Sequence, residues 1–248
     1  MNELFSINGR VVVITGGNGF LGAQFSEYLS LNGATVIVFD MQGENPVDIT
    51  DPVSVTGAVR NVVHEHGRID GVVNAAAINA TPGSADSKEM WSRYQDYPIE
   101  LWRKEIEVNL TAVQILVQSV SPVMMEQKSG SIVLIGSDLA MIAPDNSIYD
   151  AGKYKDIAYV ASKSGNLGLM RTWASYLGKF NVRVNAAIPG GMYNGQPEEF
   201  VKKNSALNML GRMSKKNEYN GMIHFLLSDA SSYMTGASLV ADGGRTAW

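Results

Sequence analysis

The sequence predicts an α/β fold in which one parallel sheet of about seven strands is doubly wound, with helices on both faces. Short apolar runs rich in β-branched residues alternate along the chain with stretches of helical periodicity. The runs are apolar almost without interruption, which is typical of strands buried on both faces. No linker, internal repeat or shift of composition divides the chain, so residues 1–248 are expected to form a single domain.

The predicted elements follow one another in a regular order. The first apolar run leads into a glycine cluster and a helical stretch, and the second run is followed by a helix over 51–67. That helix has Asp51 at its N-cap, Pro52 in its first turn and Gly67 at its end. Further helical stretches separate the remaining runs. The predicted strands are 11–15, 35–40, 71–77, 131–137, 182–190 and 238–244.

Composition excludes several classes of protein. The chain is 45% apolar and 18% charged, and its net charge of −4 gives no basic surface for nucleic acid or an anionic membrane. It has no cysteine, which rules out disulfides, iron–sulfur clusters and thiolate zinc sites. His64, His66 and His224 lack the spacing of metal ligands, so no metal is expected. With no predicted signal peptide or membrane span, we expect a soluble cytoplasmic protein.

A glycine loop follows the first strand and opens a helix. The segment TGGNGFLG (15–22) places glycines at positions 16, 19 and 22. Glycines there allow a tight turn and let backbone amides and the helix N-terminus approach a pyrophosphate. A structural turn is the alternative, but the position between strand and helix favours a Rossmann-type dinucleotide site.

The second predicted strand ends in Asp40, eighteen residues after Gly22. A carboxylate at this place can accept hydrogen bonds from both ribose hydroxyls of the adenosine half and would repel a 2′-phosphate. The glycine loop contains no Arg or Lys, and Met41 follows Asp40. The residues therefore favour NAD over NADP.

Tyr-x-x-x-Lys occurs twice within residues 148–163, as Tyr149/Lys153 and as Tyr159/Lys163. Tyrosine and lysine four positions apart on a helix share one face, and the lysine charge favours the phenolate that a base must form. The first pair encloses a glycine and precedes a polar stretch. The second follows Asp156, a good N-cap, and runs into a periodic helix. Tyr159/Lys163 is therefore the predicted acid/base pair.

These motifs occur in the order seen in the short-chain dehydrogenase/reductase family, which the whole chain resembles. The glycine loop, Asp48-Ile49, NAAA (74–77), EVNLTAV (107–113), VLIGS (133–137), YVASK (159–163) and PGGM (189–192) carry the resemblance. It implies four catalytic residues: Asn109, Ser137, Tyr159 and Lys163. In the family, the serine binds the substrate oxygen, and the asparagine holds a water that relays protons from the lysine.

The resemblance also implies residues that contact the cofactor and the substrate. The cofactor residues are Gly16, Asn18, Gly19, Phe20, Leu21, Asp40, Asp48, Ile49, Asn74, Ala75, Ala76, Tyr159, Lys163, Pro189, Gly190 and Met192. The substrate residues are Ser137, Leu139, Tyr149, Tyr159, Gly191 and Asn194. Two departures stand out, because Gly19 gives the TGxxGxxG rhythm of the longer, sugar-nucleotide-modifying branch and Ala77 replaces a glycine.

Three segments are predicted to shape the substrate end of the site. Residues 138–156 form an insertion, which is either a substrate wall or a solvated surface loop, and residues 191–211 form a mobile substrate loop. The segment 81–102 supplies four aromatic residues that suit either sugar stacking or a core. These elaborations also resemble, less specifically, the bacterial subgroup of the flagellin-modification and legionaminic-acid pathway sugar oxidoreductases.

The predicted function is therefore an NAD-dependent oxidoreductase that interconverts a secondary alcohol and a ketone, on a sugar, sugar phosphate or related polyol. One alternative is a non-catalytic dinucleotide-binding regulator. The other is a sugar-nucleotide epimerase or dehydratase that retains NAD through turnover. The resemblance also implies a homo-oligomer, a tetramer or dimer, with the helix after Tyr159 and the last strand at interfaces.

Overall fold

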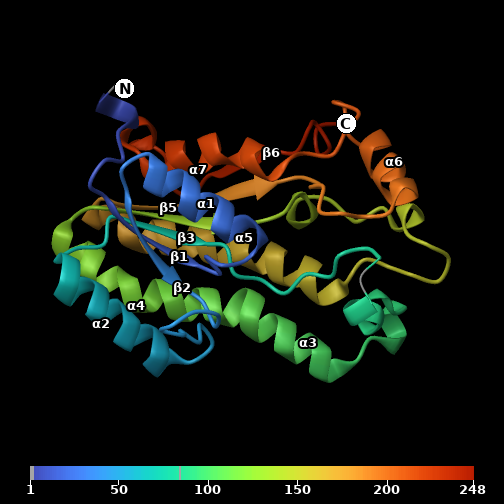
Figure 1. Cartoon of the computed structure of the whole chain (residues 1–248), viewed down its shortest axis with the longest axis horizontal. Helices are drawn as coiled ribbons and strands as arrows, with labels where there is room; N and C mark the ends of the chain where they lie inside the picture. The colour runs from blue at the N-terminus through green and yellow to red at the C-terminus, as the bar shows by residue number, and fades with distance from the viewer. Residues whose placement is uncertain (1–2, 84) are drawn as a thin grey trace.

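A computed structural model of the chain describes residues 3–83 and 85–248 (Figure 1). Within them, six parallel strands form one sheet in the order β2-β1-β3-β4-β5-β6. The predicted α/β parallel-sheet fold is confirmed, and the six strands coincide with the six apolar runs, one fewer than the count of about seven. The strands are β1 Val11–Thr15, β2 Thr35–Phe39, β3 Gly71–Asn74, β4 Gly130–Ile135, β5 Val182–Pro189 and β6 Ser238–Ala241.

The inner strands are mostly apolar because each of their faces lies against helices. In β1, Val11 and Val13 belong to one buried cluster, whereas Val12 and Ile14 belong to another on the opposite face. Successive side chains of a strand point to opposite faces, so a strand covered on both sides needs an apolar residue at every position. The unbroken apolar runs in the sequence reflect this double covering.

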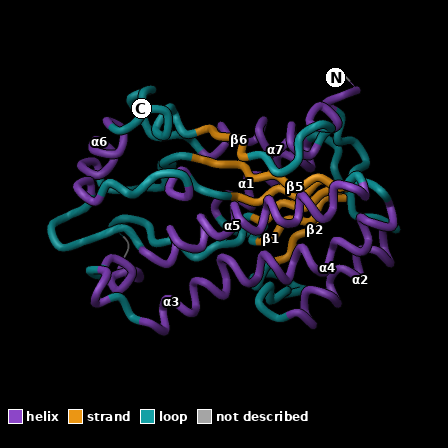
Figure 2. Tube along the Cα trace, turned by 180° about the vertical axis from the view of Figure 1, so that it is seen from behind, coloured by secondary structure: helices purple, strands orange, loops and turns teal. Residues whose placement is uncertain are grey.

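Two sets of helices cover the sheet. One cluster joins it to α2 (Pro52–His66), α4 (Ala112–Gln127) and α5 (Ile157–Leu177). The second joins it to α1 (Phe20–Leu31) and α7 (Asn220–Leu227). Figure 1 shows α7 along the top of the sheet and α2 and α4 below it, and Figure 2 shows α5 and α4 from behind. Two short helices remain, α3 (Ile99–Ile106) and α6 (Glu198–Ala206).

The chain changes its direction across the sheet between β1 and β3. From β1 it moves outward to β2, and then returns past β1 to β3, β4, β5 and β6 on the other side. The connections after β1 and β3 therefore leave the same edge of the sheet in opposite directions. A crevice at the carboxyl ends of these two strands is the usual ligand position in open α/β sheets.

A continuous helical run, Ile99–Gln127, has the length and apolar composition of a membrane-crossing helix. It consists of α3, a five-residue π-helical turn (Glu107–Thr111) and α4. In this molecule, Leu116, Val120 and Met124 of α4 pack into the cluster between the helices and the sheet. The apolar character of this run is thus the character of a core helix.

The two segments predicted to shape the substrate end have different structures. In 138–156 the regular elements are two short 3₁₀ turns, Asp138–Ala140 and Asn146–Ile148. The segment 191–211 contains α6, and its predicted mobility stays a prediction. Several predicted strands also extend past the sheet: 75–77, 136–137 and 190 lie beyond the last paired residues of β3, β4 and β5. These residues leave the ladder to form the edge at which the cavity lies.

The core position Leu116 provides a test of this packing. Its side chain is fully buried between α4 and the sheet, so Leu116→Ala is expected to lower the free energy of unfolding by about 2–5 kcal/mol. Leu31 is 79% exposed near the end of α1. Leu31→Ala is therefore expected to change the free energy of unfolding by less than about 0.5 kcal/mol. Urea unfolding of both variants checks the difference, and equal losses would contradict the packing described here.

Candidate active site

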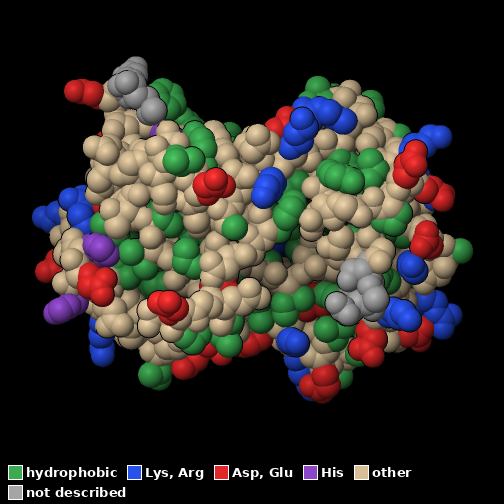
Figure 3. All heavy atoms as spheres, viewed as in Figure 1, with side chains coloured by type: hydrophobic (Ala, Val, Ile, Leu, Met, Phe, Trp, Pro, Cys, Tyr) green, Lys and Arg blue, Asp and Glu red, His purple; other side chains and the backbone are tan. Residues whose placement is uncertain are grey.

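A cavity of about 770 Å³ lies along the carboxyl edge of the sheet. The loops that follow β1, β2, β3, β4 and β5 all contribute to its lining, and the insertion, α6 and the C-terminal segment close its far end. Figure 3 shows the surface hollowed between the main body of the molecule and the part that carries α6. A cavity of this size at a topological switch point can hold a dinucleotide and a small substrate.

The glycine loop forms one wall of this cavity. Gly16 adopts a left-handed conformation (φ 64°), and a Cβ there would lie 2.7 Å from the Cα of Ala76. A side chain at Gly22 would overlap the carbonyl oxygen of Gly16. The following helix α1 has Gly19 at its N-cap and no side chain capping its first turn. Its free amides lie where a pyrophosphate would bind, so the loop fits a dinucleotide.

Two carboxylates line the adenosine end. Asp40 Oδ2 accepts a hydrogen bond from the Asn18 amide (3.0 Å), and its Oδ1 accepts one from the Gln42 amide (3.0 Å). Asp48 accepts from the backbone and side chain of Thr50, and these bonds hold the pKa of its carboxyl below the ordinary value. Ile49 lies beside it in the lining. Both carboxylates are thereby fixed in place before any ligand binds.

Three of the predicted site residues do not line the cavity. Asn18 lies on the exposed side of the loop, where its side chain donates to the Gln42 carbonyl. Asn74 is buried and accepts from the Thr15 hydroxyl (2.8 Å). The Asn109 side chain makes two hydrogen bonds with the backbone of Ile78, 2.7 and 2.9 Å long. Asn74 and Asn109 thus fix the loop after β3, and the catalytic role expected for Asn109 stays a prediction.

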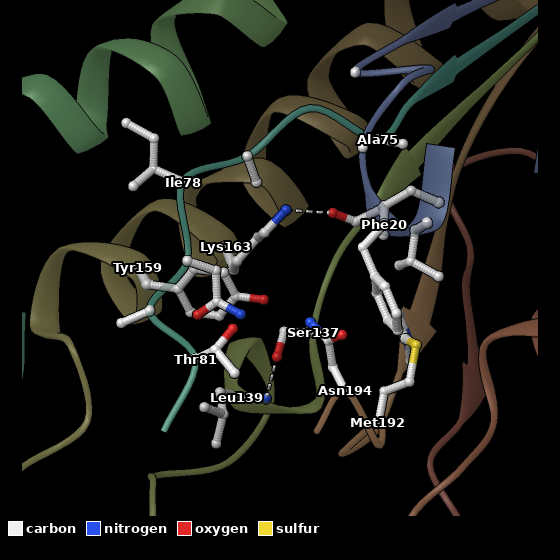
Figure 4. Close-up of a pocket in the computed structure, with 18 of the residues that line it drawn as sticks. Phe20, Ala75, Ile78, Thr81, Ser137, Leu139, Tyr159, Lys163, Met192 and Asn194 are labelled. Atoms are coloured by element: carbon white, nitrogen blue, oxygen red, sulfur yellow. Dashed lines mark hydrogen bonds between the residues drawn. The ribbon is translucent and has the colours of Figure 1, made fainter. Parts of the chain in front are cut away.

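Ser137, Tyr159 and Lys163 meet at the centre of the cavity (Figure 4). Ser137 follows β4, and the other two lie one turn apart on the buried face of α5. Asp156 caps α5 by accepting from the amides of Ala158 (2.9 Å) and Tyr159 (3.1 Å), which fixes where the helix begins. The Lys163 amino group donates to the Ile135 carbonyl (2.7 Å). The periodic helix thus carries the tyrosine and lysine into one site.

Burial changes the protonation of these groups. It raises the pKa of the Tyr159 hydroxyl to about 12, and a hydrogen bond with Ser137 acts in the opposite direction. Burial also lowers the pKa of the Lys163 ammonium to about 8. At neutral pH this phenol is therefore a proton donor, and the charged lysine beside it favours the phenolate.

The alternative pair, Tyr149 and Lys153, is not an acid/base pair in this structure. Lys153 is exposed and forms a salt bridge with Asp150 (2.8 Å). Tyr149 does line the cavity, where its ring packs against Trp91 and Phe200. Burial raises the pKa of its hydroxyl above the ordinary value. Tyr149 therefore belongs to the cavity wall, and the lysine of its motif, Lys153, is paired with Asp150.

The remaining predicted residues line the same cavity. Figure 4 shows Leu139 next to Ser137, with Asn194 and Met192 across from Tyr159 and Phe20 above them. The Leu139 amide donates to the Ser137 hydroxyl (3.2 Å) and so orients it. The other predicted residues in the lining are Gly16, Gly19, Leu21, Ala75, Ala76, Pro189, Gly190 and Gly191.

Several lining residues were not singled out by the sequence as site residues. Lys155, from the insertion, is 6% exposed and lies with its amino group 4.4 Å from the centre of the Tyr159 ring. Asn79 comes from the segment after β3, and Arg245 comes from the C-terminal segment. Of the four aromatic residues predicted in 81–102, Trp91 lines the cavity, whereas Tyr94, Tyr97 and Trp102 lie outside the lining. The sequence indicated Lys155 only as one of several polar residues of the insertion.

Known proteins are similar to this chain over almost its whole length. A family model described as enoyl-(acyl carrier protein) reductase matches residues 8–246. The 3-oxoacyl-[acyl-carrier-protein] reductase of Thermotoga maritima is 34% identical, over 96% of this chain and 98% of that protein. The trans-4-hydroxycyclohexanecarboxylate dehydrogenase of Sinomonas cyclohexanicum is 31% identical, over 96% and 93%.

A solved structure agrees with these relatives. The short-chain dehydrogenase of Leptospira borgpetersenii, determined with bound NAD⁺, is 25% identical and superposes with a TM-score of 0.88, covering 99% of this chain and 96% of that one. Similarity of sequence and of fold thus extends over almost the whole length of this chain and of these proteins. The chain belongs to the short-chain dehydrogenase/reductase family.

Proposed function

We propose that this protein is an NAD-dependent oxidoreductase that interconverts a secondary alcohol and a ketone on a sugar, sugar phosphate or related polyol. One observation carries the proposal. The glycine loop and the group formed by Ser137, Tyr159 and Lys163 open into one continuous cavity. A dinucleotide seated on the loop would therefore have its reactive end beside the proton-transfer residues.

The residues divide the chemistry among them. Bound NAD⁺ would accept the hydride from the alcohol carbon. Tyr159 exchanges the hydroxyl proton, and its place next to the substrate oxygen makes it the general acid of reduction and the base of oxidation. Ser137 is held by the Leu139 amide and positions the substrate oxygen. Lys163, one turn along α5, stabilises the Tyr159 phenolate.

Three features support NAD as the cofactor. Asp40 lies at the end of β2 with both carboxylate oxygens held by amides, in the place where a ribose would bind. The segments 15–22 and 40–48 contain no Lys or Arg to receive a 2′-phosphate. The Leptospira relative was determined with NAD⁺ bound.

A polyhydroxylated substrate is supported by the polar groups at the far end of the cavity, where Ser137, Asn79 and Asn194 join the aromatic rings of Tyr149 and Trp91. The resemblance to the flagellin-modification subgroup stays a prediction, as do the cytoplasmic location and the tetrameric or dimeric assembly.

The direct experiment is a screen of NAD⁺ reduction by the purified protein across sugars, sugar phosphates, sugar acids and polyols. Net release of NADH supports the proposal and excludes an epimerase or dehydratase, which would keep its cofactor through turnover. Release only with steroid or acyl-thioester substrates would overturn the carbohydrate assignment. Binding of NAD⁺ without turnover of any alcohol would favour a non-catalytic regulator.

Replacing the predicted acid/base residue tests the mechanism. Tyr159→Phe removes the exchanging hydroxyl and is expected to lower kcat by about 100-fold or more. Tyr149→Phe is the matched control, since it removes the same atom from the same cavity. Its hydroxyl makes no hydrogen bond with any residue that the structure describes, so KM can change while kcat stays within a few-fold. Steady-state kinetics of both variants decide, and the reverse pattern would assign the chemistry to Tyr149.

Cofactor preference depends on one carboxylate. The wild-type protein is expected to use NAD⁺ at least about 100-fold better than NADP⁺ in kcat/KM, and Asp40→Ala to lower the value for NAD⁺ about 10- to 100-fold. In Asp40→Ala, kcat/KM for NADP⁺ should not fall, because the carboxylate that would repel the 2′-phosphate is absent. Asp48→Ala is the control, since an adenine-side change affects both cofactors alike. An unchanged NAD⁺/NADP⁺ ratio in Asp40→Ala would refute the role of Asp40.

A further inference from the structure

Lys155 is a buried cation at the substrate end of the cavity. It lies in the insertion, immediately before the N-cap residue of α5, and only 6% of its surface is exposed. It belongs to the cavity lining together with Asn79, Trp91 and Tyr159. Removing a lysine ammonium from water is costly, so buried lysines are normally paired with a carboxylate.

Neutral groups hold this cation instead. The Lys155 amino group donates to the Asn79 side-chain oxygen (2.7 Å) and lies over the rings of Tyr159 (4.4 Å to the centroid) and Trp91 (5.6 Å). It forms no salt bridge with any residue that the structure describes. The cation is thus desolvated without a counter-charge at ion-pair distance.

Three acids, Asp156, Glu105 and Asp138, act on Lys155 through their charge, and each has hydrogen bonds of its own. Asp156 accepts from the first turn of α5 and from the Tyr97 hydroxyl (2.9 Å). Glu105 accepts from the same hydroxyl (2.6 Å). Asp138 accepts from the Ser137 hydroxyl and the Leu139 amide, both at 2.9 Å. Asp138 lines the same cavity, and one oxygen each of Asp156 and Glu105 is buried without a hydrogen-bond partner among the described residues, yet none of the three lies at ion-pair distance from Lys155.

The position of Lys155 is fixed by several contacts on both sides. Its backbone amide donates to the Asn146 side chain (2.9 Å), and the Tyr154 amide donates to the Trp91 carbonyl (3.1 Å). The insertion is thereby tied to the segment after β3, which also supplies Asn79. Residues far apart in sequence thus position the Lys155 ammonium group beside Tyr159.

This ammonium lies within reach of a bound substrate. It is 4.4 Å from the centre of the Tyr159 ring, whereas the amino group of Lys163 is 5.7 Å from it. A substrate oxygen at the Tyr159 hydroxyl would bring the neighbouring substituents of the reacting carbon close to Lys155. A second lining cation, Arg245, makes neither a side-chain hydrogen bond nor an ion pair with the described residues.

Building on the function proposed above, we infer that the substrate carries a carboxylate or phosphate close to the carbon that is oxidised, and that Lys155 binds this anionic group. The anion supplies a counter-charge at ion-pair distance, which no described residue provides, and the resulting charged hydrogen bond is of the strong kind. A neutral polyol would leave the buried ammonium without a partner. Lys155 is therefore the residue that selects acids over neutral alcohols.

The competing explanation is that Lys155 serves Tyr159 itself, as a second cation beside its phenolate. Its amino group lies over the face of the ring, however, and the tyrosine hydroxyl already has Ser137 and, one turn away, Lys163. The two explanations differ in a measurable way. A cation for the phenolate affects every substrate equally, whereas a cation for the substrate affects only charged ones.

The test compares substrates in matched pairs that differ in charge: D-gluconate with D-glucitol for a carboxylate, and fructose 6-phosphate with fructose for a phosphate. In the wild-type protein, kcat/KM is expected to be at least about tenfold higher for the charged member of one pair, which identifies the anion. Lys155→Met is expected to lower that value about 10- to 100-fold, mainly through KM, and to leave the neutral member within a few-fold.

Two further variants keep the test interpretable. Lys155→Arg retains the charge and is expected to preserve most of the preference for the charged member. Lys153→Met changes an exposed lysine two positions away, paired only with Asp150, and is expected to match the wild type. Circular dichroism and NAD⁺ titration confirm that each variant folds and binds cofactor. An equal loss with both members of a pair, or a wild-type preference for neutral substrates, would overturn the inference.

Calorimetric titration separates this inference from the proposed function. D-Gluconate and fructose 6-phosphate are titrated into the NAD⁺-loaded wild-type and Lys155→Met proteins, with the neutral partners as controls. Binding of an anion that weakens about 10- to 100-fold in Lys155→Met supports the inference even where no substrate is turned over, an outcome that would count against the redox function alone. Equal binding of the anions to both proteins would overturn it.

Discussion

The whole site depends on a close contact between the loops that leave β1 and β3. The sheet order reverses at these two strands, and their ends are joined by the buried hydrogen bond from Thr15 to Asn74 (2.8 Å). Gly16 packs against Ala76 so closely that a Cβ would lie 2.7 Å from its Cα. Because of this contact, the N-terminus of α1 and the chain after β3 both face the cavity. The cofactor wall and the floor of the cavity are therefore fixed by one packing constraint.

A second fixed point sets the chemical end of the cavity. Asp156 is fully buried, and one of its oxygens accepts from the first turn of α5 and from the Tyr97 hydroxyl. Glu105, also fully buried, accepts from the same Tyr97 hydroxyl, and burial raises the pKa of its carboxyl above the ordinary value. Lys155 and Tyr159 lie on either side of Asp156 in the sequence, so both are placed by it.

The sequence was sufficient for features that depend on local order. Asp156 as an N-cap and the periodic helix behind it distinguished Tyr159/Lys163 from Tyr149/Lys153, and the structure has Lys163 buried and Lys153 exposed with Asp150. The apolar runs predicted the strands because a strand covered by helices on both faces carries apolar residues on both faces. The glycine spacing indicated the loop since a turn of this kind forbids side chains at particular positions.

Contacts between distant segments leave no such pattern. The hydrogen bond from Lys155 to Asn79 spans 76 positions, and nothing local to either residue indicates the other. The same is true of Asn109, whose side chain forms hydrogen bonds with the backbone of Ile78, 31 positions away. The insertion 138–156 has charges and turns that equally suit a solvated loop. Only its pairing with the chain after β3 makes it a wall of the cavity.

That pairing also places aromatic rings beside a buried charge. Trp91, Tyr149 and Phe200 pack in series along the cavity lining, and Lys155 lies over the Trp91 ring. Exclusion of water makes an unpaired ammonium expensive, yet it strengthens any charged hydrogen bond formed there. The desolvation cost of the Lys155 ammonium is therefore offset only when an anionic group binds beside it. Desolvation of Lys155 destabilises the empty cavity, but the same desolvation strengthens the binding of an anionic substrate. A neutral substrate does not gain affinity in this way.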